Sequence, residues 1–120
     1  MISVALGWLK LIMQPLSRRF TITPLSTQDA QIIAQIELRF GLYLEKLTSK
    51  DKLALRSVLS RYIYYNKFLD NYLISDAITD TMPNLEASIC EEMIALEGIS
   101  TRTAELLIQF VTDQQISLRN

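Results

Sequence analysis

Apolar residues recur at every third or fourth position through much of this chain, and this spacing restricts its fold more than any other feature. One such series runs from residue 26 to residue 47, and a second runs from residue 49 to residue 74. Residues three and four apart share one face of an α-helix, so each series predicts a long amphipathic helix. We find no useful run of the alternating pattern that marks a half-buried strand, and the chain has only three Gly and three Pro.

The length of the chain is that of one domain. It has 120 residues, of which 49% are hydrophobic and 21% are charged, and globular domains most often have ~100–150 residues. We therefore expect residues 1–120 to form a single all-α domain. The expected architecture is a compact bundle of four or five helices that ends in a short helical hairpin at residues 84–113.

Local signals define the two long helices. Ser26 or Thr27 is suited to cap the first, with Asp29 in its first turn, and Gly41 is expected inside it at a close helix crossing. Thr48 and Asp51 have the spacing of a capping box for the second helix. The apolar stripe of the second helix consists of Leu55, Val58, Leu59, Tyr62, Leu69 and Leu73. The polar stretch at residues 75–83 predicts a loop.

Residues 1–13 are apolar on every side except at Ser3 and Lys10. A transmembrane helix needs ~20 residues, so no integral membrane span is expected here, and no basic region precedes the apolar run as in a secretory signal. Two interpretations stay open, a helix packed into the core or a subunit interface, and a weak peripheral contact with a membrane. A third alternative is that Met13 is the true start of the protein.

The absence of His and the presence of a single Cys exclude most small-enzyme chemistry. Thiol and imidazole zinc sites, Ser/His/Asp and Cys/His nucleophile systems and iron–sulfur ligation all need more of these residues. Asp76 and Asp80 lack the third acid that a metal favours, and Cys90 is expected to be buried. The sequence thus predicts no enzymatic activity, no catalytic residue, no metal and no cofactor. A single Cys cannot form an internal disulfide, so a cytoplasmic location is the default.

The net charge of −1 conceals an uneven distribution along the chain. Residues 1–67 have ten basic and four acidic residues, a net charge of +6, whereas residues 68–120 have two basic and nine acidic residues, a net charge of −7. This asymmetry favours a polyanion or an acidic partner for the first half, or head-to-tail self-association. Attraction between the two halves within the fold explains it equally well.

One face of the second long helix is basic. At ~100° per residue, four polar residues of this helix fall on the same face, with Tyr64 beside them. They are Lys52, Arg56, Ser60 and Lys67. Such a face fits phosphates and a stacked base, although a solvated Lys/Arg face is the commoner interpretation.

A short stretch near the C-terminus has the form of a known motif. Two apolar segments are joined by a tight turn, and the positions that define the pattern are Leu96, Gly98, Ile99, Ser100, Ala104 and Leu107. Residues 85–112 thereby resemble the helix-hairpin-helix motif. The resemblance implies a clamp on one nucleic-acid phosphate without base specificity, with backbone contacts from Gly98 and Ser100 and a side-chain contact from Arg102. Amides at a helix N-terminus do favour an anion.

These features lead to two hypotheses. The first is a non-enzymatic helical binding protein that contacts nucleic-acid backbone, including DNA, through Gly98, Ile99, Ser100, Arg102, Lys52, Arg56 and Lys67. The charge of residues 84–113 argues against this hypothesis. Six acids against one Arg there would repel phosphate unless the basic helix faces the same way. The alternative is a helical adaptor or assembly protein that binds other proteins or self-associates, without nucleic acid, through residues 1–13 and the acidic second half.

Overall fold

The computed structural model describes residues 26–82, 84 and 89–119. Four α-helices and one 3₁₀-helix lie in these residues, in the order α3 (Thr27–Phe40), α4 (Ser49–Asn66), α5 (Ile74–Thr81), η2 (Glu92–Leu96) and α6 (Thr101–Arg119). No strand occurs in the described part of the chain, so the all-α prediction is confirmed. The apolar segment at residues 1–13 lies outside the described residues. Among the helices described, none has the length and apolar character needed to cross a membrane.

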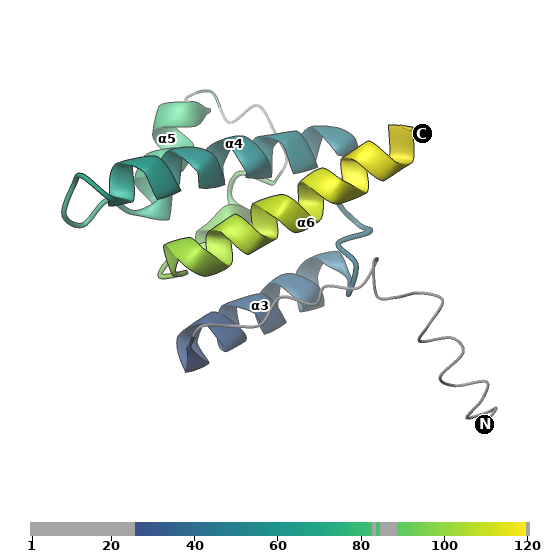
Figure 1. Ribbon diagram of the computed structural model, residues 1–120, viewed down its shortest axis with the longest axis horizontal. Coiled ribbons are helices and arrows are strands. Elements are labelled where there is room, and N and C mark those ends of the chain that lie inside the picture. Colours follow the sequence, from purple (N-terminus) through teal and green to yellow (C-terminus); the bar gives the residue numbers. More distant parts are fainter. Residues whose placement is uncertain (1–25, 83, 85–88, 120) are drawn as a thin grey trace.

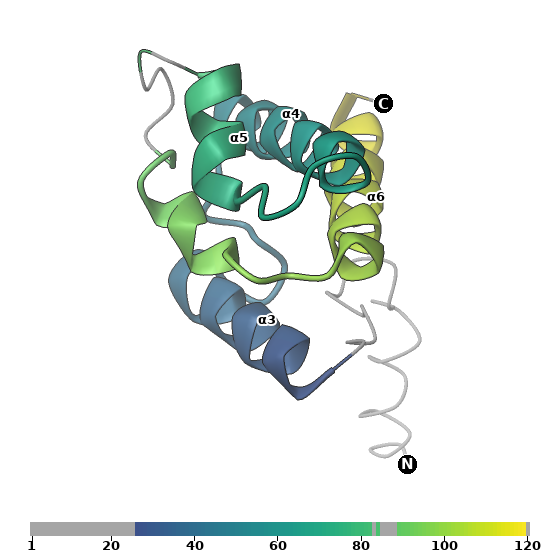
Figure 2. The ribbon, with the colours of Figure 1, turned by 90° about the vertical axis from the view of Figure 1, so that its left-hand side faces the viewer.

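The helices surround one apolar centre. α4 packs against α6 and α5, while η2 packs against α3 and α5. α6 runs between α4 and α3 in Figure 1. The end view in Figure 2 shows α4, α6, α3 and η2 around the interior, with the connection from η2 to α6 passing above α3.

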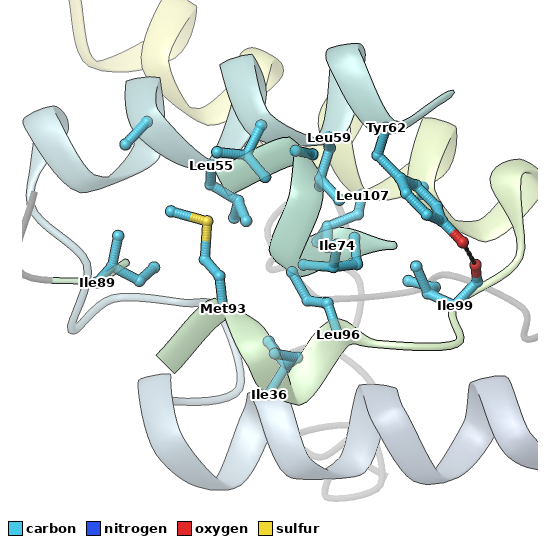
Figure 3. Packing of buried hydrophobic residues seen from close by; sticks show 14 of the residues in the cluster. Ile36, Leu55, Leu59, Tyr62, Ile74, Ile89, Met93, Leu96, Ile99 and Leu107 are labelled. Atoms are coloured by element: carbon cyan, nitrogen blue, oxygen red, sulfur yellow. Dashed lines mark hydrogen bonds between the residues drawn. The ribbon is translucent and has the colours of Figure 1, made fainter. Parts of the chain in front are cut away.

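The core draws side chains from every described element. Leu59, Ile74, Met93, Leu96 and Leu107 are all fully buried there and lie together in Figure 3. At one end of this cluster the Tyr62 hydroxyl donates a hydrogen bond of 2.8 Å to the carbonyl oxygen of Ile99. This bond ties α4 to the turn before α6 and satisfies a phenol that would otherwise be buried without a partner.

The first long helix ends earlier than expected. Ser26 caps α3 by accepting a hydrogen bond from the Asp29 amide, as predicted, but the helix stops at Phe40 rather than continuing to residue 47. Gly41 is not inside the helix. It follows the last residue with a φ of 95°, a conformation that favours glycine. The chain then turns so that Leu44, with a φ of 58°, is completely buried.

The prediction for residues 49–74 was correct at the start of the helix and wrong at its end. Thr48 and Asp51 form the expected capping box. α4 nevertheless ends at Asn66, and the predicted stripe residues Leu69 and Leu73 are exposed. The turn after α4 is stabilised by the Asn66 side chain, which donates to the carbonyl oxygen of Tyr72 at 3.1 Å.

Residues 75–81 of the stretch predicted as a loop belong to a helix instead, α5 (Ile74–Thr81). Its apolar residues Ile74, Ala77 and Ile78 are buried at helical spacing. Glu97 caps the helix from far along the chain, since its carboxylate accepts from the amides of Ile74 at 2.8 Å and Ser75 at 3.3 Å. An acid at a helix N-terminus is stabilising, and here the acid lies more than 20 residues later in the sequence.

The helical hairpin expected at residues 84–113 is not confirmed, because η2 packs mainly against α3 and α5 rather than against α6. η2 is a single stretch of 3₁₀-helix over Glu92–Leu96, and residues 85–88 of the expected first arm lie outside the described residues. The second arm, α6, begins at Thr101 with Ser100 as its cap, as expected. It continues to Arg119 rather than ending near residue 113.

Candidate functional site

The turn before α6 is the first candidate site, and a carboxylate of the same chain lies against it. Asp29 is 1% exposed. Its Oδ1 accepts from the Ser100 amide at 3.0 Å, and its Oδ2 accepts from the Ser100 hydroxyl at 2.6 Å and from the Thr103 hydroxyl at 2.8 Å. The Ser100 amide, which the helix-hairpin-helix resemblance assigns to a phosphate, thus already has an anionic partner.

The position of Asp29 follows from where two helices begin. It lies in the first turn of α3 and beside the first turn of α6, so one carboxylate is close to the positive ends of two helix dipoles. The Ser100 hydroxyl extends the arrangement by accepting from the Thr103 amide at 3.2 Å. An external phosphate would have to compete with Asp29 for the Ser100 amide.

The other residues of the turn also have structural roles. Gly98 has a φ of 93°, and a Cβ atom added there would meet the Gln28 side chain of α3. Ile99 and Ala104 are both buried in the core. Arg102 is exposed on α6. Of the residues assigned to the phosphate clamp, Arg102 is therefore the one with an exposed side chain.

The predicted basic face of α4 is only partly exposed. Lys52 is buried, with 6% of its surface exposed, and loss of hydration there lowers the pKa of its ammonium group although the nearby Glu45 opposes this shift. Arg56 is half-buried and donates to the Gln115 side chain of α6 at 2.6 Å. Lys67 is exposed at the end of α4. A buried lysine is a poor phosphate ligand, so Lys52 does not belong to an exposed basic face.

The turn and the basic face do not share a surface. Tyr62 points into the core and binds the Ile99 carbonyl of the turn. Ser60 and Tyr64 are each two positions from Tyr62, which is ~200° around an α-helix, so they face the opposite way. Both are exposed. The seven residues predicted to bind nucleic acid thus do not share one surface. Gly98, Ile99 and Ser100 lie at the junction with α3, whereas Arg56 and Lys67 lie on the outer side of α4. Lys52 is buried, and Arg102 is exposed on α6.

That outer face carries exposed apolar side chains in a stripe. Leu53 is 48% exposed, Tyr64 is 57% exposed and Phe68 is 67% exposed, and the small side chains of Ser57 and Ser60 lie between them. The spacing of three or four residues places all five on one side of α4 and the turn that follows it. We call these five residues the outer stripe.

Hollows lie on both sides of the outer stripe. Toward α6, one hollow of about 330 Å³ is lined by Ser60, Ile63, Tyr64, Lys67, Phe68 and Ile108. Its neighbour, of about 310 Å³, is lined by Leu53, Arg56, Ser57, Ser60 and Ile108. Toward α5, a hollow of about 530 Å³ is lined by Ser57, Ser60, Arg61, Tyr64, Tyr65 and Thr81. The charged groups in these linings are all cationic.

Aromatic contacts hold the end of the outer stripe in place. The Tyr64 ring centroid lies 5.0 Å from that of Tyr65 and 5.2 Å from that of Phe68. The Arg61 guanidinium lies 5.6 Å from the Tyr65 ring centroid and donates to Thr81 on α5 at 3.1 Å. Edge-to-face and cation–π contacts of this kind restrict side chains that are otherwise exposed.

Sequence reasoning found part of this face and missed part of it. Ser60, Tyr64, Arg56 and Lys67 were expected together, and each lines a hollow. Ile108 was missed because it comes from α6, and the packing of α6 on α4 carries no local sequence signal. Leu53 could have been predicted as part of this face, since an apolar residue outside the buried stripe of an amphipathic helix marks a second face.

Two smaller expectations concern the remaining reactive side chains. Cys90 is buried, as predicted, with its Sγ 3.6 Å from the Sδ of Met82. The Tyr72 hydroxyl donates to Asp80 at 2.8 Å, and burial first, then this hydrogen bond, raises the pKa of Tyr72 to about 12. Within the described residues, no cluster of three or more Cys, Asp or Glu side chains is arranged to hold a metal.

Comparison with family models, with curated proteins and with solved structures finds no match to this chain. The function is therefore inferred from the geometry of the outer face of α4 and of the turn before α6.

Proposed function

We propose that this protein is a helical adaptor or assembly protein, and that the outer face of α4 is its contact surface for another protein. The observation that carries the proposal is the exposure of Leu53, Tyr64 and Phe68 in one stripe beside two hollows, of which the one near Phe68 is mainly apolar. Exposed apolar side chains grouped in this way are typical of interaction sites, and aromatic residues are enriched there. Isolated exposed apolar residues would carry no such meaning.

Nucleic-acid binding is less well supported by the same geometry. The Ser100 amide is bonded to Asp29, and Lys52 is buried. Tyr62, which bonds to the turn, lies about 200° around α4 from Tyr64 of the outer stripe. Arg56, Arg61 and Lys67 are the cations near the stripe, which is a small number for a phosphate-binding surface. An apolar lining adds affinity for protein side chains and little for a phosphate backbone.

Site-specific photo-crosslinking tests the proposal. A benzophenone amino acid replaces Tyr64 in the full chain, and a matched variant carries it at Gln35, an exposed position on α3. We expect irradiation in cells to give a discrete protein adduct from position 64 but not from position 35. The adduct should form again between the two purified proteins.

Two results would count against the proposal. One is that position 64 gives no protein adduct, or the same adducts as position 35. The other is that position 64 gives adducts with nucleic acid and the purified protein binds DNA or RNA at ~50 mM salt with the steep weakening by ~200 mM that phosphate contacts produce. The second result would restore the nucleic-acid hypothesis.

A further inference from the structure

We infer that the hollows between α4 and α6 bind an acidic amphipathic helix of a partner protein. The inference rests on the proposed function and adds the chemical character of the partner. Three properties of the site carry it, which are its length, the apolar side chains in its lining and the sign of its charges.

The length and profile of the site suit a helix. The two hollows share Ser60 and Ile108 in their linings, so they adjoin each other along α4, and we call the pair the groove. From Leu53 to Asn66, where α4 ends, the groove spans about 20 Å at ~1.5 Å per residue, the length of about three and a half helical turns. Ser57 and Ser60 lie in the middle of the outer stripe, where their small side chains let a second helix approach closely.

The hollow near Phe68 is mainly apolar, the hollow near Leu53 is of mixed polarity, and larger side chains mark the ends of the groove. Ile63 of α4 and Ile108 of α6 line it, both partly buried, with Leu53 at one end and Tyr64 and Phe68 at the other. A helix binds such a groove with apolar residues at spacings of three and four, so the partner helix should be amphipathic.

The charges of the groove specify an acidic partner. Arg56 and Lys67 line it, and no carboxylate does. Arg56 bonds to the neutral Gln115 side chain, so its charge is not cancelled there. The nearest acid on α6 by sequence is Glu105, which lies outside the lining. Acidic residues flanking the apolar face of a partner helix would meet both cations, while a basic helix would be repelled.

The test uses a designed 18-residue helical peptide with a Leu face flanked by Glu. Two control peptides accompany it, one with every Glu replaced by Lys and one with the same composition in scrambled order. Binding to the full chain is measured by fluorescence anisotropy, and the site is mapped from amide chemical shifts in NMR spectra. We expect the acidic amphipathic peptide alone to bind, with shifts concentrated between residues 53 and 68 and around Ile108.

Variants of the protein test the contacts. Tyr64→Ser should weaken binding about 10-fold, as for an aromatic anchor, and Lys67→Glu should weaken it about 3- to 10-fold. The matched controls are Leu38→Ser, which removes an exposed apolar side chain of α3, and Arg102→Glu, which reverses an exposed cation of α6. Both controls should bind as the wild type does. Circular dichroism confirms that each variant is folded.

The inference is overturned if the scrambled or the Lys peptide binds as well as the acidic one, if the shifts lie elsewhere, or if the Tyr64 and Lys67 variants bind normally. Concentration-dependent shifts at the same residues without peptide would instead identify a second copy of this chain as the occupant. If the peptide fails while crosslinking from position 64 still gives a protein adduct, the acidic helix is wrong but the proposed function stands.

Discussion

Replacing Asp29 should be the most costly single polar change in the described fold. Its carboxylate is almost completely buried and accepts from two groups of Ser100 and from Thr103. Hydrogen bonds to a charged group are worth about 1.5–3 kcal/mol each, but removal of a shared acceptor is not additive. We expect Asp29→Ala to lower the free energy of unfolding by about 3–5 kcal/mol, the range for breaking a buried charged group away from its partners.

A smaller change separates the hydrogen bonds from the packing. Asp29→Asn keeps the size of the side chain but replaces one acceptor oxygen with an NH₂ group and removes the charge, so at least one of the three donors loses its acceptor and we expect a loss of about 2–3 kcal/mol. Thr103→Val removes one donor at constant volume and should cost about 1–2 kcal/mol. Because the two side chains are bonded to each other, combining Asp29→Asn with Thr103→Val should lower the free energy of unfolding by about 1–2 kcal/mol less than the sum of the two single effects.

Urea denaturation followed by circular dichroism measures all of these differences. Asp113→Asn is the matched control, because Asp113 is exposed on α6, and it should change stability by less than about 0.5 kcal/mol. Formate should raise the urea midpoint of Asp29→Ala more than that of the wild type, because it replaces the lost carboxylate at the α6 N-terminus. An Asp29→Asn cost below about 1 kcal/mol, or additive losses with Thr103→Val, would refute the account of this junction.

The remaining predictions concern three other positions. Gly41→Ala should destabilise the protein by about 1–2 kcal/mol in urea denaturation, because the φ of 95° is unfavourable for Ala, whereas a Gly inside a continuous helix would give a gain of about 1 kcal/mol. Tyr72→Phe should flatten the loss of stability at alkaline pH. The raised pKa of Tyr72 contributes stability that is complete below pH 10.0, its ordinary value, and disappears as the pH rises through about 12, so parallel curves for both proteins in this window would contradict the expectation. Lys52→Met should be neutral or stabilising at pH 7, since the folded state disfavours the charged ammonium; a loss above about 1 kcal/mol in the same urea assay would show that the buried charge is well compensated.

The fold class and most helix starts could be predicted from sequence because their causes are local. Thr48 and its capping partner are three residues apart, and such pairs are visible in the sequence. Helix ends and α5 were missed because their causes are distant. Gly41 ends α3 although an isolated Gly is compatible with a helix, and α5 is capped by Glu97 from another part of the chain.

The candidate site shows the same division between local and distant causes. The glycine-containing turn and the basic face were both visible as patterns in the sequence, and Ile99 in the turn is buried. Their spatial relation was not visible, because it depends on Tyr62 facing the turn from the core side of α4. The partner of the α6 N-terminus was equally hidden, since Asp29 reads in the sequence as an ordinary first-turn acid of α3.

The junction at Asp29 also sets an order for folding during synthesis. The carboxylate and its donors are separated by 71 to 74 residues. At ~5–20 residues per second, a ribosome needs about 4–15 s to add the intervening chain. During that time the Asp29 carboxylate lacks the donors of Ser100 and Thr103 that accompany its burial in the folded protein. We expect α4 and α5 to associate first and α3 to dock only after Thr103 has been made. A nascent chain stalled before Ser100 should therefore leave α3 open to proteolysis. The domain can then be completed only after the start of α6 has been synthesised.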